Sequence, residues 1–301
     1  SKHLVIPSEK LKTKPLKNSD EILVEKNTSE SKLESMLQGV DILLFIEIYG
    51  WHRDLFVVAK KLKIKTVCLV NWEWFNPDDS NWRKVDFLAA ATRYTISFLK
   101  GLGFSNLLYL PPPIKLEDLP ERVITGKGRS FFHNAGIIDD DDRKATHAVI
   151  RAFSKVKNPE IQLLVRSQHP VDLKVDDSRI IIHRGNLLDR ADLYREGDVA
   201  IQPSKLEGVG FNILEPVACG VPTITTDCEP MNEWVSERFL RVKTSFWKKK
   251  SFSNKMAGIK HAFLRSPSVR ALSKAIEWCA SNDLSDISRA QRATAISRLA
   301  K

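Results

Sequence analysis

The chain has 301 residues, of which 43% are hydrophobic and 28% are charged, a balance typical of globular proteins with a buried core. This length exceeds one ordinary domain and predicts two. No apolar stretch approaches the roughly 18 residues that cross a bilayer, and no signal-like segment opens the sequence, so we expect a cytoplasmic protein. The four cysteines are widely spaced, which favours buried thiols over a disulfide framework or a paired metal site.

The net charge of +10 raises the question of an anionic partner. The basic residues are spread along the chain without a nucleic-acid-binding motif, so we predict no nucleic-acid partner. The densest run is three lysines at residues 248–250, next to Trp247. We interpret this run as a solvated loop, and peripheral contact with an anionic membrane surface or an acidic glycan remains open as the alternative.

The first part of the chain alternates short apolar runs with helical patterns, which is typical of an α/β domain. The pattern predicts strands at residues 3–7, 21–24, 41–46, 66–70 and 87–91, and helices at 31–37, 55–62 and 93–102. Three consecutive prolines at residues 111–113 interrupt every regular pattern. We therefore predict one domain over residues 1–112 and a second over residues 113–284.

The second domain continues the same alternation and is also predicted to be α/β. Its expected strands are residues 130–136, 161–165, 180–185, 198–203 and 221–226, and its expected helices are residues 143–153, 187–194, one starting near Phe211, and one from about 271 to 280. A break at residues 281–283 precedes a last helix over residues 285–301.

A glycine loop between two of these strands is the strongest functional signal. In an open parallel sheet, a loop between a strand and a helix lies at the carboxyl end of the strands, and the first N–H groups of the helix face an anion such as phosphate. Glu207 stands before Gly208 and Gly210, and Glu215 lies about one turn into the helix. Carboxylates accept hydrogen bonds from vicinal hydroxyls. A phosphate site between two such acids indicates a sugar nucleotide.

The spacing Glu207-x7-Glu215, followed by Pro-x-Ala-x-Gly-x-Pro, closely resembles the donor-site signature of retaining glycosyltransferases of family 4. The similarity extends in order over roughly residues 85–228. It implies the GT-B fold, in which two Rossmann-like domains face each other across a cleft and the C-terminal helix, here residues 285–301, packs back on the first domain. Family members begin with a strand and a glycine-rich loop that nothing before His3 supplies, so we expect an excised or remodelled N-terminus.

The resemblance also assigns roles to individual residues. Lys144 would neutralise the departing diphosphate, Glu207 would orient the donor sugar, and both are predicted catalytic residues. Glu215 would bind the ribose diol. The other predicted donor-binding residues are Gly136, Arg143, Arg184, Gly208, Gly210, Phe211 and Asn212. Ile137 stands where family members usually carry a base, so a second charge for the phosphates would have to come from Arg143 or Arg166.

A polar and aromatic cluster after the strand at residues 66–70 is the predicted acceptor-side wall. It contains Asn71, Trp72 and Glu73, and His52 is added because it lies in a strand-to-helix loop. Asn71 stands where family members commonly carry a histidine, and an amide does not titrate as a base. Trp72 is open to two interpretations, stacking on a sugar ring or packing in the core.

The four aspartates at residues 139–142 suggest either a metal site or the cap of the following helix. Metal ions such as Mg²⁺ need converging oxygens rather than a run of acids, so we favour the cap and predict neither a metal nor a cofactor.

Taken together, these residues predict a retaining, metal-independent glycosyltransferase. Its partners would be a nucleoside-diphosphate sugar and a glycan, lipid-linked or other acceptor. A sugar-nucleotide-binding subunit without turnover is the first alternative, and a GT-B epimerase or phosphorylase is the second. A dinucleotide oxidoreductase is disfavoured because the glycine loop lacks a third glycine.

Overall fold

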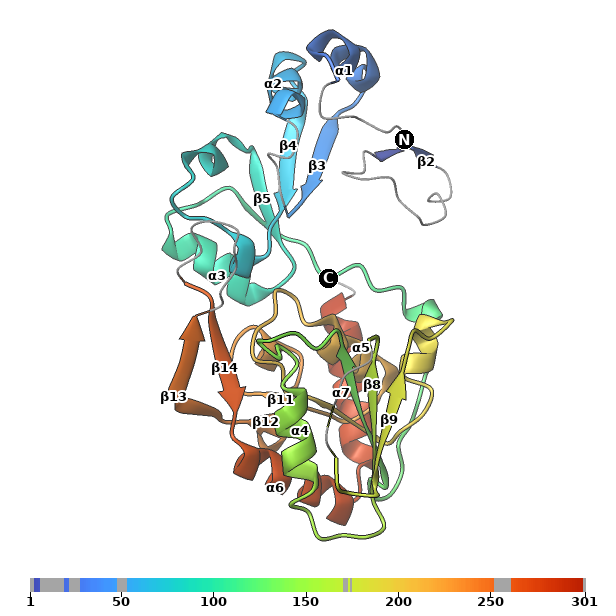
Figure 1. Ribbon diagram of the computed structural model, residues 1–301. Helices are drawn as coiled ribbons and strands as arrows, with labels where there is room; N and C mark the ends of the chain where they lie inside the picture. The colour runs from blue at the N-terminus through green and yellow to red at the C-terminus, as the bar shows by residue number, and fades with distance from the viewer. Residues whose placement is uncertain are drawn as a thin grey trace. The chain divides into compact units, whose positions relative to one another are not determined.

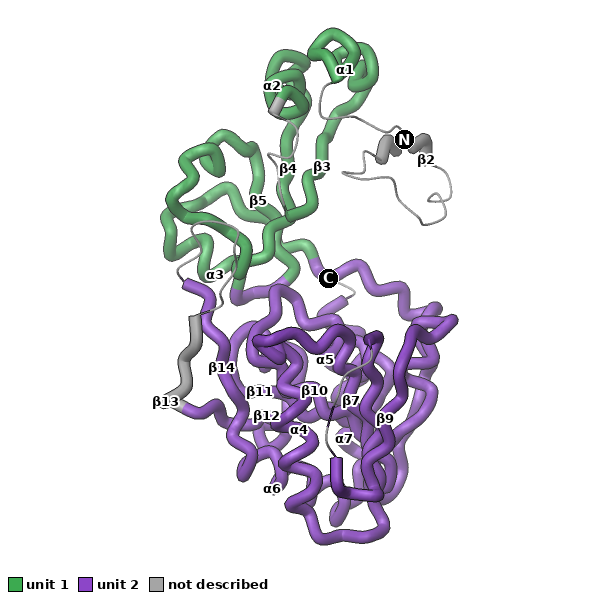
Figure 2. The backbone as a smooth tube through the Cα atoms, in the orientation of Figure 1, with its two compact units in different colours: residues 1–91, 95–110 green, residues 92–94, 111–301 purple. Residues whose placement is uncertain are grey.

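The computed structural model describes residues 3–5, 19–21, 28–47, 53–169, 173, 175–251 and 261–299. Its helices and strands alternate along the chain (Figure 1). Contacts divide the chain into two compact units, residues 1–91 with 95–110 and residues 92–94 with 111–301 (Figure 2). The main division after Leu110 lies close to the boundary predicted after residue 112. No helix in the described ranges is both long enough and apolar enough to cross a membrane.

The first unit contains a four-stranded parallel sheet. Its strands, in spatial order, are β3 (Ile42–Ile46), β4 (Lys65–Leu69), β5 (Phe87–Ala90) and β6 (Leu107–Tyr109). A separate parallel pair joins β1 (His3–Val5) to β2 (Ser19–Glu21). The helices are α1 (Glu30–Leu37), α2 (Arg53–Lys61) and α3 (Arg93–Gly101), with short 3-10 helices η1 (Trp72–Trp74) and η2 (Ser80–Lys84). The other predicted elements of this unit are present, whereas residues 6–7 and 22–24 of the two predicted N-terminal strands lie outside the described residues. Strand β6 was not predicted.

Helix α2 shows why this sequence forms the first unit's core. Leu55, Val58 and Ala59 recur at helical spacing and are fully buried or nearly so. They belong to the same apolar cluster as Phe45 of β3 and Leu88 of β5. One apolar stripe per helix thus attaches the helices to the sheet.

The second unit contains a six-stranded, wholly parallel sheet. Its strands, in spatial order, are β12 (Arg241–Val242), β11 (Thr223–Thr226), β10 (Val199–Gln202), β7 (Ser130–Gly136), β8 (Gln162–Ser167) and β9 (Ile180–Arg184). The first of these strands in the chain, β7, pairs with β8 on one side and with β10 on the other. The strand order reverses at that point, and ligands of open α/β sheets bind at such a switch point.

In the described part of the second unit, four α-helices accompany this sheet: α4 (Thr146–Phe153), α5 (Phe211–Cys219), α6 (Val269–Ser281) and α7 (Ser285–Leu299). Helix α7 is held to the second unit by Ser288, whose hydroxyl donates to the Gly220 carbonyl at 2.5 Å, and by Gln291, whose side-chain oxygen accepts from the Thr223 N–H at 3.1 Å. These bonds attach α7 beside α5 and β11, and its packing on the first domain stays a prediction.

Two local predictions in the second unit were wrong. Residues 187–194 were expected to be an α-helix, and the structure has only the short 3-10 helix η4 (Arg190–Leu193), which Asp189 caps by accepting from the Ala191 N–H at 3.0 Å. The lysine run at residues 248–250 was expected in a loop, and it lies in strand β13 (Thr244–Ser251), antiparallel to β14 (Phe263–Pro267). The remaining short elements are η3 (Leu116–Asp118), η5 (Met231–Glu233) and η6 (Arg238–Leu240).

Candidate functional site

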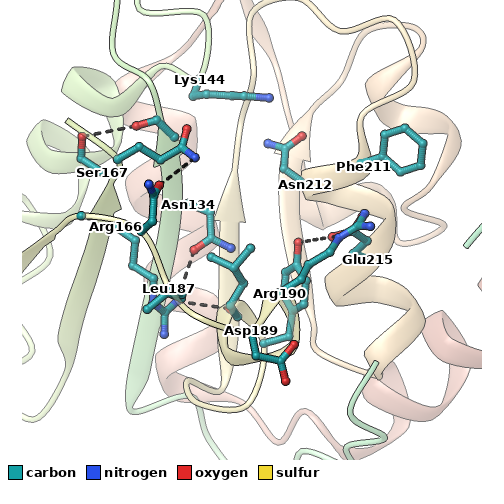
Figure 3. A pocket seen from close by; sticks show the side chains of 16 residues that line it. Asn134, Lys144, Arg166, Ser167, Leu187, Asp189, Arg190, Phe211, Asn212 and Glu215 are labelled. Carbon is teal, nitrogen blue, oxygen red and sulfur yellow. Dashed lines mark hydrogen bonds and ion pairs between the residues drawn. The ribbon is translucent and has the colours of Figure 1, made fainter. Parts of the chain in front are cut away.

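A cavity of about 510 Å³ lies at the carboxyl ends of β7, β8 and β9, beside the start of α5 (Figure 3). Its charged lining is mixed in sign, with three basic and two acidic side chains. These are Lys144, Arg166, Arg190, Asp189 and Glu215. Because all of its lining residues belong to the second unit, the cavity is a feature of that unit alone.

The start of α5 forms one wall of this cavity. Gly210 takes the left-handed backbone conformation, with φ of 83°, and its carbonyl accepts from the N–H groups of Ile213 and Leu214 at 2.9 and 3.0 Å. The N–H groups of Phe211 and Asn212 precede the helical hydrogen bonds, and both residues line the cavity. This wall therefore presents the positive end of a helix to a ligand.

The glycine loop is held in place by a residue that the sequence did not indicate. The indole N–H of Trp234, which is 2% exposed, donates to the Val209 carbonyl at 2.6 Å. Trp234 lies 15 residues beyond Cys219, the last residue of α5, and no local pattern connects it with the loop.

Glu215 is buried at the second turn of α5, with only 2% of its surface exposed. The Tyr194 hydroxyl donates to its Oε2 at 2.5 Å, and Arg190 donates to the same oxygen through Nε at 3.3 Å and forms an ion pair with Oε1 (Figure 3). Burial raises the pKa of Tyr194, so its hydroxyl stays a proton donor at neutral pH. Glu215 is thus a charged acceptor held in a fixed position, and Arg190 is a site residue that the sequence analysis missed.

Glu207 is placed differently. Its Oε1 lies 2.5 Å from the Lys144 Nζ, and it does not line the cavity, whereas Lys144 does. Figure 3 shows the Lys144 side chain extending toward the α5 side of the cavity. Arg143 is also outside the lining: its guanidinium donates to the Leu206 carbonyl at 3.2 Å and so holds the segment before Glu207.

Arg166, the other candidate for a second phosphate charge, does line the cavity. Its guanidinium donates to the Asn134 side-chain oxygen and to the Leu193 carbonyl, both at 3.2 Å, and lies 5.4 Å from the ring centre of Phe132. It is only 7% exposed, and this burial lowers its pKa from the ordinary value. Arg166 is therefore a fixed part of the wall.

The other predicted donor-binding residues divide between the lining and its surroundings. Gly136 ends β7 and lines the cavity, while Gly208 and Gly210 belong to the loop beside it. Arg184 ends β9, and the lining includes its neighbours Gly185 and Asn186 instead. The structure thus gathers five of the predicted donor-site residues in one cavity: Gly136, Lys144, Phe211, Asn212 and Glu215.

Asp142, the last aspartate of the run, caps the start of α4, as the sequence analysis favoured. Asp142 accepts from the backbone N–H of Thr146 at 2.7 Å and of His147 at 3.3 Å, and it forms an ion pair with Lys205 at 3.5 Å. Within the described ranges, no three His, Cys, Asp or Glu side chains are grouped so that they could hold a metal ion.

The predicted acceptor-side residues lie in the first unit. The Asn71 side chain donates to the Glu47 carboxylate at 2.6 Å. Trp72 is 5% exposed and meets Phe98 edge to face, with ring centres 6.2 Å apart, which agrees with the core-packing interpretation. Glu73 is also buried, and His52 lies outside the described residues. A role for these residues in acceptor binding stays a prediction.

The sequence of the second unit matches a known family. Residues 132–257 match the family model of the glycosyl transferases group 1, and this range includes every residue that lines the cavity. This part of the second unit therefore resembles a group 1 glycosyltransferase domain. The chain is therefore a glycosyltransferase, as the spacing of the two glutamates predicted. No curated protein sequence matches the chain.

Solved structures establish the fold of this glycosyltransferase. A glycosyltransferase from Rickettsia africae ESF-5 matches with a TM-score of 0.66 at 15% identity, over 93% of this chain and 80% of that one. Sucrose-phosphate synthase from Thermosynechococcus elongatus matches with a TM-score of 0.60 at 12% identity, over 90% and 73%. The pneumococcal O-GlcNAc transferase GtfA, in complex with UDP and GlcNAc, matches with a TM-score of 0.53 at 16% identity, over 90% and 56%. The predicted GT-B fold is thus confirmed.

Proposed function

We propose that this glycosyltransferase moves a sugar from a nucleoside-diphosphate sugar to an acceptor, with retention of the anomeric configuration and without a metal ion. One observation carries the proposal. The cavity of the group 1 domain combines the buried Glu215 carboxylate, the start of α5 and the Lys144 amine. A diol acceptor, an anion-binding helix terminus and a cation are the three groups that a ribose and a diphosphate require.

In this proposal the chain's own groups stabilise the leaving diphosphate. Negative charge grows on the diphosphate as the sugar departs, and we assign its stabilisation to the Lys144 amine and the N–H groups of Phe211 and Asn212. Glu215 binds the ribose diol. Glu207 orients the donor sugar, and its contact with Lys144 links that task to the position of the amine. Retention follows from front-face attack assisted by the leaving phosphate, which the family resemblance implies.

The acceptor belongs to the same proposal. We assign it to the class of glycans, lipid-linked glycans or other hydroxyl compounds, because the donor chemistry needs only a hydroxyl nucleophile. The complex of GtfA with UDP and GlcNAc supports a nucleotide-sugar donor for a chain of this fold. A cytoplasmic location, and membrane contact through the lysines at residues 248–250, complete the proposal.

A second candidate function is sugar-nucleotide binding without turnover. Asn71 favours it, because this amide stands where the resembled family commonly carries a histidine, and its side chain is bonded to Glu47. Such a protein would keep the Glu215 site and lose the acceptor chemistry.

The test has two steps. Thermal shifts with uridine, guanosine, adenosine and thymidine diphosphates identify the base. The chain is then incubated with the matching nucleotide sugars, with and without candidate acceptors and with EDTA, while released diphosphate and the anomeric proton signal of the product are followed. We expect diphosphate release that is insensitive to EDTA and a retained anomer. Binding without release would support the second candidate, and no binding of any diphosphate would overturn both.

A further inference from the structure

The carboxylate that the proposed function assigns to the ribose is already occupied. Tyr194 uses one hydrogen-bonding position of Oε2, and Arg190 contacts both oxygens of Glu215. A carboxylate offers about four acceptor positions, of which these contacts take three, and a ribose diol donates two hydrogen bonds. One partner must therefore yield when the diol binds.

Exposure identifies which partner yields. Tyr194 is 2% exposed and packs against Phe132, with ring centres 6.4 Å apart, so it is fixed in the wall. The Arg190 side chain is 62% exposed, although it pairs with a carboxylate that is almost completely buried. An exposed arginine loses little by changing partners, because water and a second anion both compensate it.

The surroundings of Arg190 indicate its second partner. Its guanidinium lies 6.0 Å from the ring centre of Phe211, the first residue of α5, so it lies near the helix terminus that is proposed to bind the diphosphate. Of the other two cations of the lining, Lys144 is already assigned to the diphosphate and contacts Glu207, and Arg166 is only 7% exposed and bonded within the wall. A guanidinium also matches the geometry of two phosphate oxygens better than an ammonium does.

We propose that Arg190 exchanges Glu215 for an oxygen of the donor diphosphate when the donor binds. The inference rests on the proposed function and adds a donor-binding residue to it. Arg190 supplies the second positive charge that Ile137 does not provide. A nucleoside without phosphates has to break the ion pair of Arg190 with Glu215 and gives Arg190 no new anionic partner. A nucleoside diphosphate breaks the same ion pair and replaces it with a phosphate contact. The exchange therefore makes the site selective for the phosphorylated form.

The first test compares Arg190→Gln with Arg195→Gln by calorimetry. Arg195 is a matched control, because it is an exposed arginine a few residues away that pairs with Asp189 and Asp192 and does not line the cavity. The probes are the nucleoside diphosphate chosen by thermal shift, its nucleoside, and inorganic pyrophosphate. For Arg190→Gln we expect the diphosphate and pyrophosphate to bind about tenfold more weakly, the size of one charged hydrogen bond, and the nucleoside to bind at least as well as to the wild type. Arg195→Gln should leave all three affinities unchanged.

The second test asks whether the two partners compete. Glu215→Gln removes the charge that holds Arg190, so pyrophosphate should bind more tightly than to the wild type, and adding Arg190→Gln should abolish that gain. Equal weakening of nucleoside and pyrophosphate by Arg190→Gln would show a structural role and overturn the exchange, as would no change in any affinity. If the wild-type chain binds no nucleoside diphosphate, the proposed function fails together with the inference. Wild-type binding that is unaffected by Arg190→Gln defeats the inference alone.

Discussion

Glu207 and Glu215 lie on either side of the same Gly-x-Gly turn, and the structure gives them different surroundings. Glu215 sits on a regular helix, faces the cavity and accepts from a buried tyrosine. Glu207 sits in the loop before the helix, does not line the cavity, and contacts Lys144. Both are nearly buried, at 2% and 7% exposure, so burial alone does not distinguish them.

This difference separates two ways in which an acid serves a site. Glu215 lines the cavity, so its carboxylate is an acceptor for a ligand that displaces Arg190. The clearest contact of Glu207 is with another side chain of the site, so its first effect is to position the Lys144 amine. Replacing each acid should accordingly affect different parts of a nucleotide.

The largest effect is expected at Glu215. Replacing it with alanine removes two hydrogen bonds between a ribose diol and a charged acceptor, so we expect nucleoside-diphosphate affinity to fall about a hundredfold. Calorimetry with the 2′,3′-dideoxy analogue provides the control, because that ligand has no diol to lose. If the substitution weakened the analogue as much as the parent compound, Glu215 would not be the diol acceptor.

His133 offers a contrast to both acids, since it is fully buried without a charge. Its Nδ1–H donates to the Ile201 carbonyl at 2.6 Å, and its Nε2 accepts from the Thr146 hydroxyl at 3.0 Å. Burial lowers the pKa of His133 from 6.5 to about 4. Between those values the unfolded chain binds a proton that the folded chain excludes, so stability falls as the pH falls through this window.

The size of this effect can be measured by urea unfolding. At pH 5 the loss relative to pH 7 should be about 2 kcal/mol from His133 alone. His133→Leu removes the titrating group, so its free energy of unfolding should decline less over the same range, even if it starts lower. An unchanged slope in that variant would assign the acid sensitivity to other groups.

The sequence predicted those features of the site that depend on local patterns. The turn at Gly210, the helix after it and the strands on either side follow from a glycine pair between apolar runs. The partnership of Arg190 with Glu215 could not be read in this way, because it joins a 3-10 helix to an α-helix 25 residues further along the chain. Strand β6 was missed because it has only three residues, and so short a segment shows too little alternation of apolar and polar residues to be distinguished from a loop.

The helix predicted at residues 187–194 was wrong for a related reason. The apolar residues of this segment have helical spacing, which is why a helix was predicted. In the structure the Asp189 carboxylate accepts from the Ala191 N–H at 3.0 Å and closes a tight turn. Because of this error Arg190 was not selected in the sequence analysis. In an α-helix over residues 187–194, nothing in the sequence would distinguish Arg190 from any other exposed arginine. Contacts between segments that are distant in the sequence thus determine which charged residues line the cavity.

A smaller effect is expected at Lys144. Lys144→Met removes one charged contact to the diphosphate, so its affinity should fall about tenfold while that of the nucleoside changes little. Lys205→Met is the control, since Lys205 is a half-buried, ion-paired lysine near the same loop that does not line the cavity. Equal losses in the two variants would mean that the loop's stability, rather than the Lys144 charge, supports binding.

The smallest effect is expected at Gly210, where backbone and ligand effects can be separated. An alanine there would keep φ near 83° and would place its Cβ 3.3 Å from the Ile213 side chain, so we expect a loss of about 1 kcal/mol in the free energy of unfolding. Gly103 in the first unit is a matched control, with φ of 82° and no atom within 4 Å of an added Cβ. Both variants carry the same backbone strain, and only Gly210→Ala disturbs the helix start that faces the cavity. Pyrophosphate titration should therefore show weaker binding for Gly210→Ala and wild-type binding for Gly103→Ala, and equal binding by the two variants would remove the start of α5 from the phosphate site.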